Sequence, residues 1–444
     1  MNLYTIPVPD AENETFIVYR PLIGLAFIGN RSLVDLAYRL ADEPQTPLRP
    51  DIAQFLQTIG FFQEDPPAPE PPTGEFVPLG VTLLLTNQCQ LRCTYCYAAA
   101  GEFTRQVLPL EYGRLAIDYV AEAMQRRGAP RLDVSLHGGG EPTFPWKTLQ
   151  SLVAYSRQKP MPASITLTSN GIWSKSQTQW ILSYIDGVTI SMDGGPETQN
   201  RQRPLASGRP SSDWVMHTIG ELDSHSFPYG IRMTALPPWE NLPRDVQFLC
   251  ENTHCASMHV EPAFNTRRGE ETGPQDDEGP GFARAFLEAA QIASQAGRQL
   301  FYSGAGLENV TATFCGSGYN SLIVTPEGSL VACYTTTSND HPLAPFTTIG
   351  HIQDGKIQID EAARARLHHL LKERRSACRD CFCYWSCAGD CFAKFLSPQH
   401  GGHLVYDGRC DINRSLLRDL MLRRMAGNNG IWMRYSPCRH SPLP

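Results

Sequence analysis

Six strand–helix units follow one another between residues 81 and 295, and this repeat constrains the fold more than any other feature. Each unit joins a short apolar run to a longer amphipathic run. The expected strands are 81–86, 132–137, 164–169, 187–192, 229–236 and 257–264, and the expected helices are 110–124, 146–156, 176–185, 213–224, 244–252 and 281–295. Such a repeat predicts an α/β protein with a parallel sheet covered by helices. Six units fit a partial, TIM-like (β/α)6 barrel over residues 78–300.

Small and polar residues follow the expected strands, at the ends where barrels of this kind place their chemistry. The segment CQLRCTYC (89–96) follows the first strand and HGGGEPT (137–143) follows the second. SNG (169–171) follows the third strand, MDGG (192–195) follows the fourth, and the sixth carries Glu261. These segments therefore predict a binding site on one rim of the barrel.

The loop after the first strand carries Cys89, Cys93 and Cys96, spaced C-x3-C-x2-C. A structural zinc site needs four closed ligands, so three thiols leave one metal position open. Thiolates also suit iron–sulfur clusters. A four-iron cubane held by three thiolates has one iron free for another ligand. The alternative is a zinc knuckle that a distant histidine completes.

The thiol trio, followed by GGGEP (138–142) after the second strand, resembles the radical S-adenosylmethionine (radical SAM) superfamily. The resemblance implies that the free iron binds SAM and that an electron cleaves SAM to a 5′-deoxyadenosyl radical, which takes a hydrogen atom from the substrate. Cys89, Cys93 and Cys96 would then be the catalytic ligands. The implied SAM contacts are Tyr97, Gly138, Gly139, Gly140, Glu141, Ser169, Asn170, Ser191 and Arg203. Glu261 is expected either to cap its strand or to contact SAM.

A second cysteine array lies in residues 301–411, and its spacing resembles a SPASM domain, which extends many radical SAM enzymes. The resemblance implies two auxiliary clusters, and hence three [4Fe–4S] clusters in all. One set of ligands is Cys378, Cys381, Cys387 and Cys410, and the other is Cys315, Cys333 and Cys391. The three-cysteine set would keep an open iron, or Cys383 would fill the vacancy. A zinc ribbon is the alternative for this array. Cys250, Cys255, Cys383 and Cys438 are left over, and each is expected to be an idle thiol or small apolar filler unless Cys383 fills that vacancy.

Residues 1–64 precede a proline-rich linker, 65–77, and are expected to form a small α+β module. Two strands around a turn (14–30) and two helices (32–41 and 51–62) are predicted there. This pattern resembles the PqqD-like elements that bind the leader of a precursor peptide by adding it as an extra strand. A structural arm packed on the barrel is the alternative. Residues 412–444 are expected to form a C-terminal amphipathic helix and tail.

These resemblances imply an oxidoreductase that acts on a peptide, namely a maturase that crosslinks side chains of a ribosomally made precursor. The bond would be a thioether or a C–C or C–O link. Its partners would be the precursor peptide with its leader and an external electron donor such as flavodoxin or ferredoxin. An anaerobic, formylglycine-forming sulfatase-maturing enzyme is the alternative. A non-catalytic, zinc-stabilised peptide-binding protein is the alternative from another class.

The composition of the 444-residue chain indicates which partners and which cellular location to expect. Its net charge of −7 and lack of a basic block give no support for a nucleic-acid partner. No apolar run approaches the roughly 18 residues that cross a bilayer, so no membrane partner is expected. The N-terminus lacks a signal-peptide pattern, which predicts a cytoplasmic protein. Its fourteen cysteines then indicate metal binding or redox chemistry rather than disulfides.

Overall fold

The computed structural model describes residues 1–9, 14–263, 268–269, 278–397, 403–404 and 408–434. Its largest sheet has eleven strands, in the order β10-β9-β8-β7-β6-β5-β4-β11-β12-β13-β14. The six expected parallel strands are its centre, and every neighbouring pair among them is parallel. They are β4 (Gly80–Leu84), β5 (Leu132–His137), β6 (Ala163–Ser169), β7 (Gly187–Ser191), β8 (Tyr229–Ala235) and β9 (Ser257–Pro262). Cys438 lies outside the described residues.

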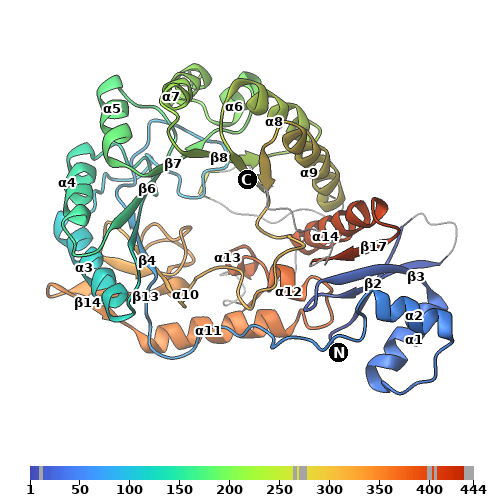
Figure 1. Ribbon diagram of the computed structural model, residues 1–444. Coiled ribbons are helices and arrows are strands. Elements are labelled where there is room, and N and C mark those ends of the chain that lie inside the picture. The colour runs from blue at the N-terminus through green and yellow to red at the C-terminus, as the bar shows by residue number, and fades with distance from the viewer. Residues whose placement is uncertain (10–13, 264–267, 270–277, 398–402, 405–407, 435–444) are drawn as a thin grey trace.

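Helices cover the outer face of this curved parallel sheet (Figure 1). They are α3 (Leu110–Arg126), α4 (Trp146–Arg157), α5 (Lys175–Tyr184), α6 (Pro196–Gln202), α7 (Ser212–Ser224), α8 (Asn241–Asn252) and α9 (Glu278–Gln295). All six expected helices form, whereas α6 was not expected from the sequence. It begins at Pro196, whose fixed φ suits the first turn of a helix.

Burial alternates along four of the parallel strands, because successive side chains point to opposite faces of a sheet. Leu132, Val134 and Leu136 on β5 are buried against the helices, whereas the side chains between them are partly buried on the concave face. β7, β8 and β9 alternate in the same way. The sheet is therefore apolar toward its helices and polar toward the barrel interior.

Strands that the sequence repeat did not predict extend the sheet at both ends. β10 (Gln299–Phe301) pairs in parallel with β9, and β11 (Ser321–Val324) pairs in parallel with β4. An antiparallel meander continues from β11 through β12 (Ser329–Val331), β13 (Thr348–Gln353) and β14 (Lys356–Ile359). The first half of the cysteine array therefore shares a sheet with the barrel.

Two long helices and several short elements make up the rest of the C-terminal half. They are α10 (Ala344–Thr347), α11 (Glu361–Ser376), α12 (Tyr384–Cys387), α13 (Phe392–Phe395), the pair β15 (Leu396–Ser397) and β16 (His403–Leu404), and α14 (Arg409–Ala426). The proline-rich segment runs along α11 (Figure 1), where Arg364 donates to the Gly74 carbonyl over 3.2 Å.

The N-terminal module contains a sheet that both ends of the chain build. Its order is β1-β2-β3-β17, with β1 (Tyr4–Pro7), β2 (Thr15–Arg20), β3 (Leu25–Asn30) and β17 (Ile431–Met433). The expected hairpin and both expected helices, α1 (Arg31–Asp42) and α2 (Pro50–Thr58), are present. β17 pairs antiparallel with β3 across about 400 residues of sequence, a partnership that local periodicity could not indicate.

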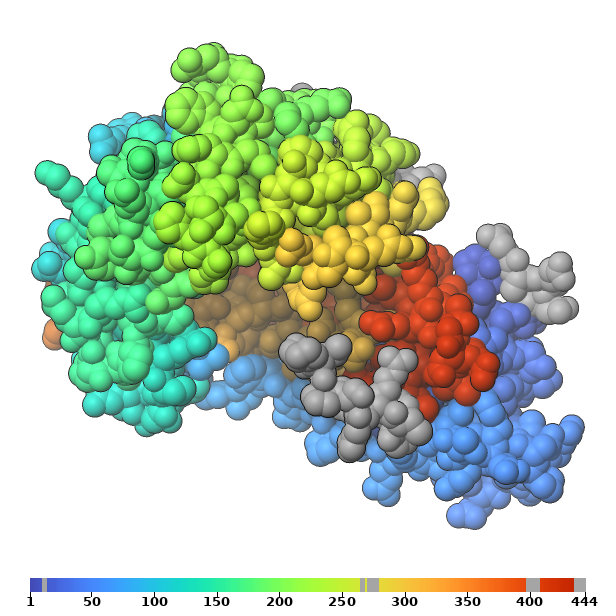
Figure 2. Space-filling model, turned by 45° about the horizontal axis from the view of Figure 1, so that its top comes forward, coloured from blue at the N-terminus to red at the C-terminus, as the bar shows by residue number. Residues whose placement is uncertain are grey.

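Both faces of this sheet are covered. Phe16, Val18 and Phe27 pack with side chains of α1 and α2. On the opposite face Ile17 and Tyr19 pack with α14 and with Cys383 and Cys387. Figure 2 shows α14 in red between the barrel and the blue N-terminal module. Within the described residues, no helix has the length and apolarity to span a membrane.

A buried ion pair links β2 to the start of the proline-rich segment. The Arg20 side chain is 1% exposed and lies 2.6 Å from the Asp65 carboxylate. It also donates to the Gln63 carbonyl over 2.9 Å and to the Phe61 carbonyl. The ion pair between Arg49 and Asp51 offers an exposed comparison. Its charged atoms lie 2.8 Å apart, and the two side chains are 78% and 62% exposed.

We expect Arg20→Ala to lower the free energy of unfolding by about 3 kcal/mol, because it strands a buried carboxylate and two carbonyls. Arg49→Ala should change it by less than about 0.5 kcal/mol. Urea unfolding followed by circular dichroism measures both. Equal effects of the two substitutions would contradict this view of the module.

Candidate functional site

The three-thiol loop between β4 and α3 is held in place by backbone hydrogen bonds to two other parts of the chain. The Arg92 and Thr94 amides donate to carbonyls just after and at the end of α6, over 2.8 and 2.9 Å. The Gly269 amide donates to the Cys96 carbonyl over 2.9 Å. The loop therefore has one conformation set by segments far away in sequence.

Two arginines that the sequence did not single out clamp the same loop. Arg92 donates to the carbonyls of Cys89 (2.8 Å) and Gly101 (3.0 Å). Arg268 donates to the carbonyls of Cys93 (2.7 Å) and Ala100 (2.8 Å) and pairs with Glu102. Guanidinium groups suit this work because their planar fork holds several donors. Arg92 could have been noticed in the sequence because it lies between Cys89 and Cys93. No pattern in the sequence indicated a role for Arg268.

Donors are directed at the sulfurs of this trio. The Leu91 amide lies 3.4 Å from the Cys89 sulfur, and the Asn170 side-chain amide lies 3.6 Å from it. Arg203 Nη1 lies 3.9 Å from the Cys93 sulfur. Such donors favour thiolates, the form that binds metal.

Burial keeps Cys89 and Cys93 protonated in the absence of metal. It raises the pKa of Cys89 to about 12, with the Glu141 carboxylate adding to the effect. Burial likewise raises the pKa of Cys93 to about 11, although Arg203 opposes it. A metal centre would displace these protons, and its positive charge would compensate for the burial of thiolates. The three thiols, two of which have donors on their sulfurs, therefore suit a cluster with one iron left open.

Arg203 holds the far side of the trio through a second buried ion pair. Its guanidinium lies 3.0 Å from the Asp193 carboxylate and 5.3 Å from the centre of the Tyr95 ring. Burial opposes the charge of Arg203, but Asp193, Tyr95 and Cys93 outweigh it, so its pKa is raised. Tyr95 also donates to Asp193 over 2.5 Å. The structure thus brings Arg203 to the trio, with Asp193 and Tyr95 as partners that the sequence did not predict.

The glycine run beside the trio is required by close backbone packing. The Gly140 amide donates to the Thr86 carbonyl over 2.8 Å, and the Glu141 amide donates to the Gln88 carbonyl over 2.7 Å. A Cβ on Gly140 would overlap the Gln88 carbonyl, and one on Gly138 would overlap the Gly140 carbonyl. The glycines therefore bring the end of β5 directly against the loop that carries Cys89.

Glu141 is 2% exposed and joins the ends of β5 and β6. Its Oε1 accepts from the hydroxyls of Thr143 (2.8 Å) and Ser169 (2.7 Å), and its Oε2 accepts from the Asn170 amide (2.8 Å). Burial raises the pKa of Glu141, although these hydrogen bonds oppose the shift. Glu141 thereby orients Asn170, whose side chain reaches Cys89.

Two other predicted SAM contacts, Tyr97 and Ser191, lie near the same rim. Tyr97 is half-buried directly after Cys96. Ser191 ends β7 and is the neighbour of Arg232 on β8. Arg232 in turn donates to His259 Nδ1 on β9 over 2.5 Å. These residues face the polar interior of the barrel, next to the rim.

Glu261 is already occupied by protein partners. Its Oε1 accepts from His259 Nε2 (3.0 Å) and from the Ser303 amide (3.1 Å), and its Oε2 lies 3.6 Å from Arg409 on α14. Burial would raise the pKa of Glu261, but His259 and Arg409 outweigh it and lower it to about 2. Glu261 thus joins the barrel rim to the C-terminal helix.

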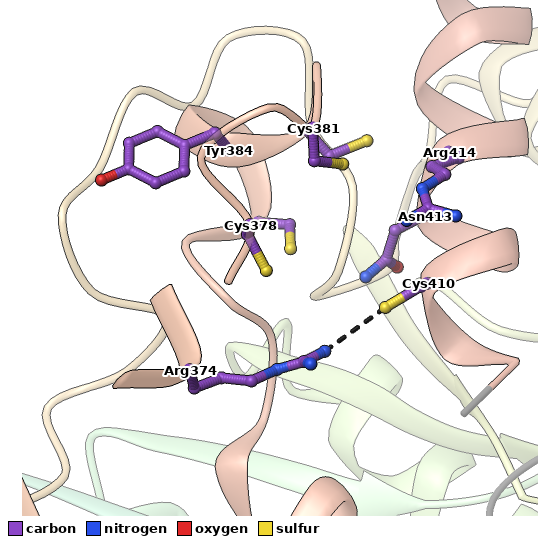
Figure 3. Close-up of a pocket in the computed structure, with 9 residues that line it drawn as sticks. Arg374, Cys378, Cys381, Tyr384, Cys410, Asn413 and Arg414 are labelled. Carbon is purple, nitrogen blue, oxygen red and sulfur yellow. Dashed lines mark hydrogen bonds between the residues drawn. The ribbon is translucent and has the colours of Figure 1, made fainter. Parts of the chain in front are cut away.

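Five cysteines gather in one hollow of the second array (Figure 3). It encloses about 310 Å³ of space outside protein atoms, part of it open to solvent. The lining residues are Arg374, Cys378, Cys381, Cys383, Tyr384, Cys387, Cys410, Asn413 and Arg414. Arg374 donates to the Cys410 sulfur over 3.3 Å, as the dashed line in Figure 3 marks. Cys383 therefore lies with the four-cysteine set.

The remaining array cysteines meet near β12. The Ser317 hydroxyl lies 3.0 Å from the Cys315 sulfur and donates to the Ala332 carbonyl, next to Cys333, over 2.7 Å. Cys333 is also close enough to Cys391 to contribute to the raised pKa of that buried thiol, after burial itself. The described cysteines are free thiols. Within the described part of the chain, no three His, Cys, Asp or Glu side chains converge as the ligands of a single metal ion do.

The adjacent glycines Gly140 and Gly139 give a matched test of the close packing. A Cβ on Gly139 would lie 3.0 Å from the Thr337 side chain, which can shift, whereas a Cβ on Gly140 meets backbone. We expect Gly140→Ala to destabilise the protein by about 1–3 kcal/mol and Gly139→Ala to cost clearly less. Thermal unfolding followed by circular dichroism measures the difference. Equal tolerance at both positions would show that the loop does not depend on this contact.

Two curated relatives align with much of the chain. The sporulation killing factor maturation protein SkfB of Bacillus subtilis (strain 168) is 25% identical over 313 residues, which are 68% of each chain. The mycofactocin maturase MftC of Mycobacterium tuberculosis is 23% identical over 343 residues, covering 72% of this chain and 80% of MftC.

Solved structures share the fold. The structure of anSMEcpe with bound AdoMet matches with a TM-score of 0.62 and 16% identity, covering 79% of this chain and 95% of the other. SuiB of Streptococcus suis bound to its precursor peptide SuiA matches with a TM-score of 0.53 and 16% identity, covering 75% and 76%.

One family profile covers the rim that the structure assembles. Residues 83–249 match the profile described as "Radical SAM superfamily". This range contains the thiol trio, the glycine run, Glu141, Asn170 and Arg203. The chain therefore carries a radical SAM domain with a mixed α/β fold built on a parallel sheet.

Proposed function

We propose that this protein is a radical SAM peptide maturase that installs a side-chain crosslink, a thioether or a C–C or C–O link, in a ribosomally made precursor peptide. The observation that carries the proposal is the three-thiol loop at the barrel rim, with donors on its sulfurs. This loop leaves one metal position for a cofactor, and it lies at the mouth of a polar barrel interior. The cluster and SAM would supply a radical that abstracts hydrogen.

The residues around the trio have distinct tasks in this proposal. Cys89, Cys93 and Cys96 hold the [4Fe–4S] cluster, and Arg92 and Arg268 fix the loop that carries them. The glycine backbone (138–140) lines the methionine end of SAM. The other proposed SAM contacts are Tyr97, Ser169, Asn170, Ser191 and Arg203. Glu141 and Glu261, whose carboxylate oxygens already have protein partners, are proposed to position the rim. Glu141 acts through Ser169 and Asn170, because both of its carboxylate oxygens accept from protein donors.

Support for a peptide substrate comes from the relatives. SkfB and MftC are named for maturation, and SuiB was solved with its precursor peptide. The N-terminal sheet supports the same substrate class. Its faces are covered, so a leader would bind as an added strand at an edge, next to β1 or β17.

We further propose that the second array is a SPASM domain with two auxiliary [4Fe–4S] clusters. Cys378, Cys381, Cys387 and Cys410 line a hollow rather than converging on a point, as suits a cluster in which each thiolate binds a different iron. Cys315, Cys333 and Cys391 form the other set. These clusters would accept the electron left after bond formation. An external donor such as flavodoxin or ferredoxin would supply the electron that cleaves SAM, in the cytoplasm.

A formylglycine-forming enzyme of the sulfatase-maturing type is the second candidate. Like the crosslinking maturase, it would use a radical SAM domain on a peptide, and the fold shared with anSMEcpe suits either reaction. The two differ in the change they make to the substrate. A non-catalytic, zinc-stabilised peptide-binding protein remains the contrast from another class, and metal analysis separates it from both enzymes.

We expect anaerobically reconstituted protein to hold about twelve irons per chain, from three four-iron clusters. Cys93→Ala should lose about four of them and the ability to cleave SAM to 5′-deoxyadenosine. Cys250→Ala, at a half-buried thiol on α8, is the control and should keep both. Iron analysis and chromatography of the nucleoside are the measurements. Full SAM cleavage by Cys93→Ala, or zinc in place of iron, would exclude the proposal.

A short precursor gene beside the gene for this protein would supply the candidate peptide. After anaerobic incubation with SAM and a reductant, we expect the peptide to lose two hydrogens, about 2 Da, because a crosslink replaces two X–H bonds with one new bond. High-resolution mass spectrometry measures the change, and Cys93→Ala protein is the control. Conversion of a serine or cysteine to formylglycine, without a link between side chains in fragment spectra, would favour the second candidate.

A further inference from the structure

Five thiols line the hollow, whereas the proposed cluster needs four thiolate ligands. Cys383 is the surplus thiol, and it is 2% exposed. It lies in contact with Cys381, because the two side chains share a hydrogen bond.

Tight turns bring both thiols to the same side of the hollow. The Cys381 amide donates to the Cys378 carbonyl over 2.9 Å, and the Tyr384 amide donates to the Cys381 carbonyl over 2.8 Å. Cys383 then starts α12, with its carbonyl accepting from the Cys387 amide over 2.9 Å. Only Phe382 separates the two cysteines, so their sulfurs face the same corner.

The two thiols differ in what surrounds them. Cys381 is half-buried, and Arg414 hydrogen-bonds to its sulfur. Cys383 is buried within the apolar cluster that contains Ile17, Tyr19 and Leu417, whereas Cys381 packs against the outside of the same cluster. One thiol thus belongs to the rim of the hollow and the other to its inner wall, beneath the N-terminal sheet.

We propose that Cys383 is a fifth thiol of this site, an alternative to Cys381 as the ligand of one iron of the auxiliary cluster. The inference rests on the proposed [4Fe–4S] assignment of the hollow. In the exchange, the Cys381 thiolate leaves the iron and takes up a proton, while the Cys383 thiol gives up a proton and binds. The net change is one proton moved from Cys383 to Cys381, along their hydrogen bond. The cluster keeps four thiolates and its oxidation state.

Iron analysis of the full-length chain tests this pairing. The variants are Cys378→Ala alone, Cys378→Ala with Cys381→Ala, Cys378→Ala with Cys383→Ala, and the triple variant, each reconstituted anaerobically with iron and sulfide. Three thiolates are enough for a four-iron cluster, as at the proposed radical SAM site, so Cys378→Ala should keep about twelve irons per chain, like the wild type. We expect about twelve irons in both double variants too, because either Cys381 or Cys383 completes a set of three thiols with Cys387 and Cys410. The triple variant leaves two thiols in the hollow and should fall to about eight irons.

A fall to about eight irons in either double variant overturns the proposal, because the remaining thiol of the pair then fails to replace its neighbour. Circular dichroism of each variant guards against a loss caused by misfolding. A triple variant that keeps twelve irons would instead overturn the cluster assignment of the hollow. That outcome separates failure of the proposed function from failure of the inference.

Discussion

Arg409 is the buried charge on which the relative placement of the barrel and the cysteine array depends. Its guanidinium lies 3.1 Å from Asp390 and 3.6 Å from Glu261, and Asn413 donates to Asp390 over 2.8 Å. A buried cation costs several kcal/mol unless carboxylates surround it with good geometry. Both carboxylates must therefore be in place when the protein folds. Asp390 lies in the turn between Cys387 and Cys391, and Arg409 precedes Cys410, so the same network positions thiols of both auxiliary sets.

The barrel shows a related division between its two faces. Apolar side chains of the strands pack under the outer helices and supply the stability, whereas the concave face keeps Ser191, Arg232 and His259. A polar interior cannot close into a dry core without leaving polar groups unsatisfied. It instead provides a lined space below the rim that carries the thiol trio. Stability and chemistry are thus carried by alternate residues of the same strands.

The N-terminal module is built into the body rather than attached to it. β17 completes its sheet, α14 covers one face, and Cys383 and Cys387 belong to the same apolar cluster as Ile17 and Tyr19. The inner wall of the thiol hollow is therefore also the underside of the sheet. The sequence favoured either a recognition unit or a packed arm. The observed packing is that of an arm packed on the body. The edges of the sheet stay available for peptide recognition.

The sequence by itself determined the six strand–helix units and the rim segments, because each is encoded over a few neighbouring residues, and it predicted the thiol groups from their spacing. Alternation and helical periodicity are local, and a turn of eight residues can hold three thiols without help from the rest of the chain. Only the tertiary structure decided that Arg268 clamps the trio, that Glu261 faces Arg409, that Cys383 joins the four-cysteine set and that β17 pairs with β3. Each of these contacts joins residues that are distant in sequence or depends on how a turn orients a side chain. Hydrophobic burial and ion pairing select such partners in space, and no local pattern along the chain records that choice.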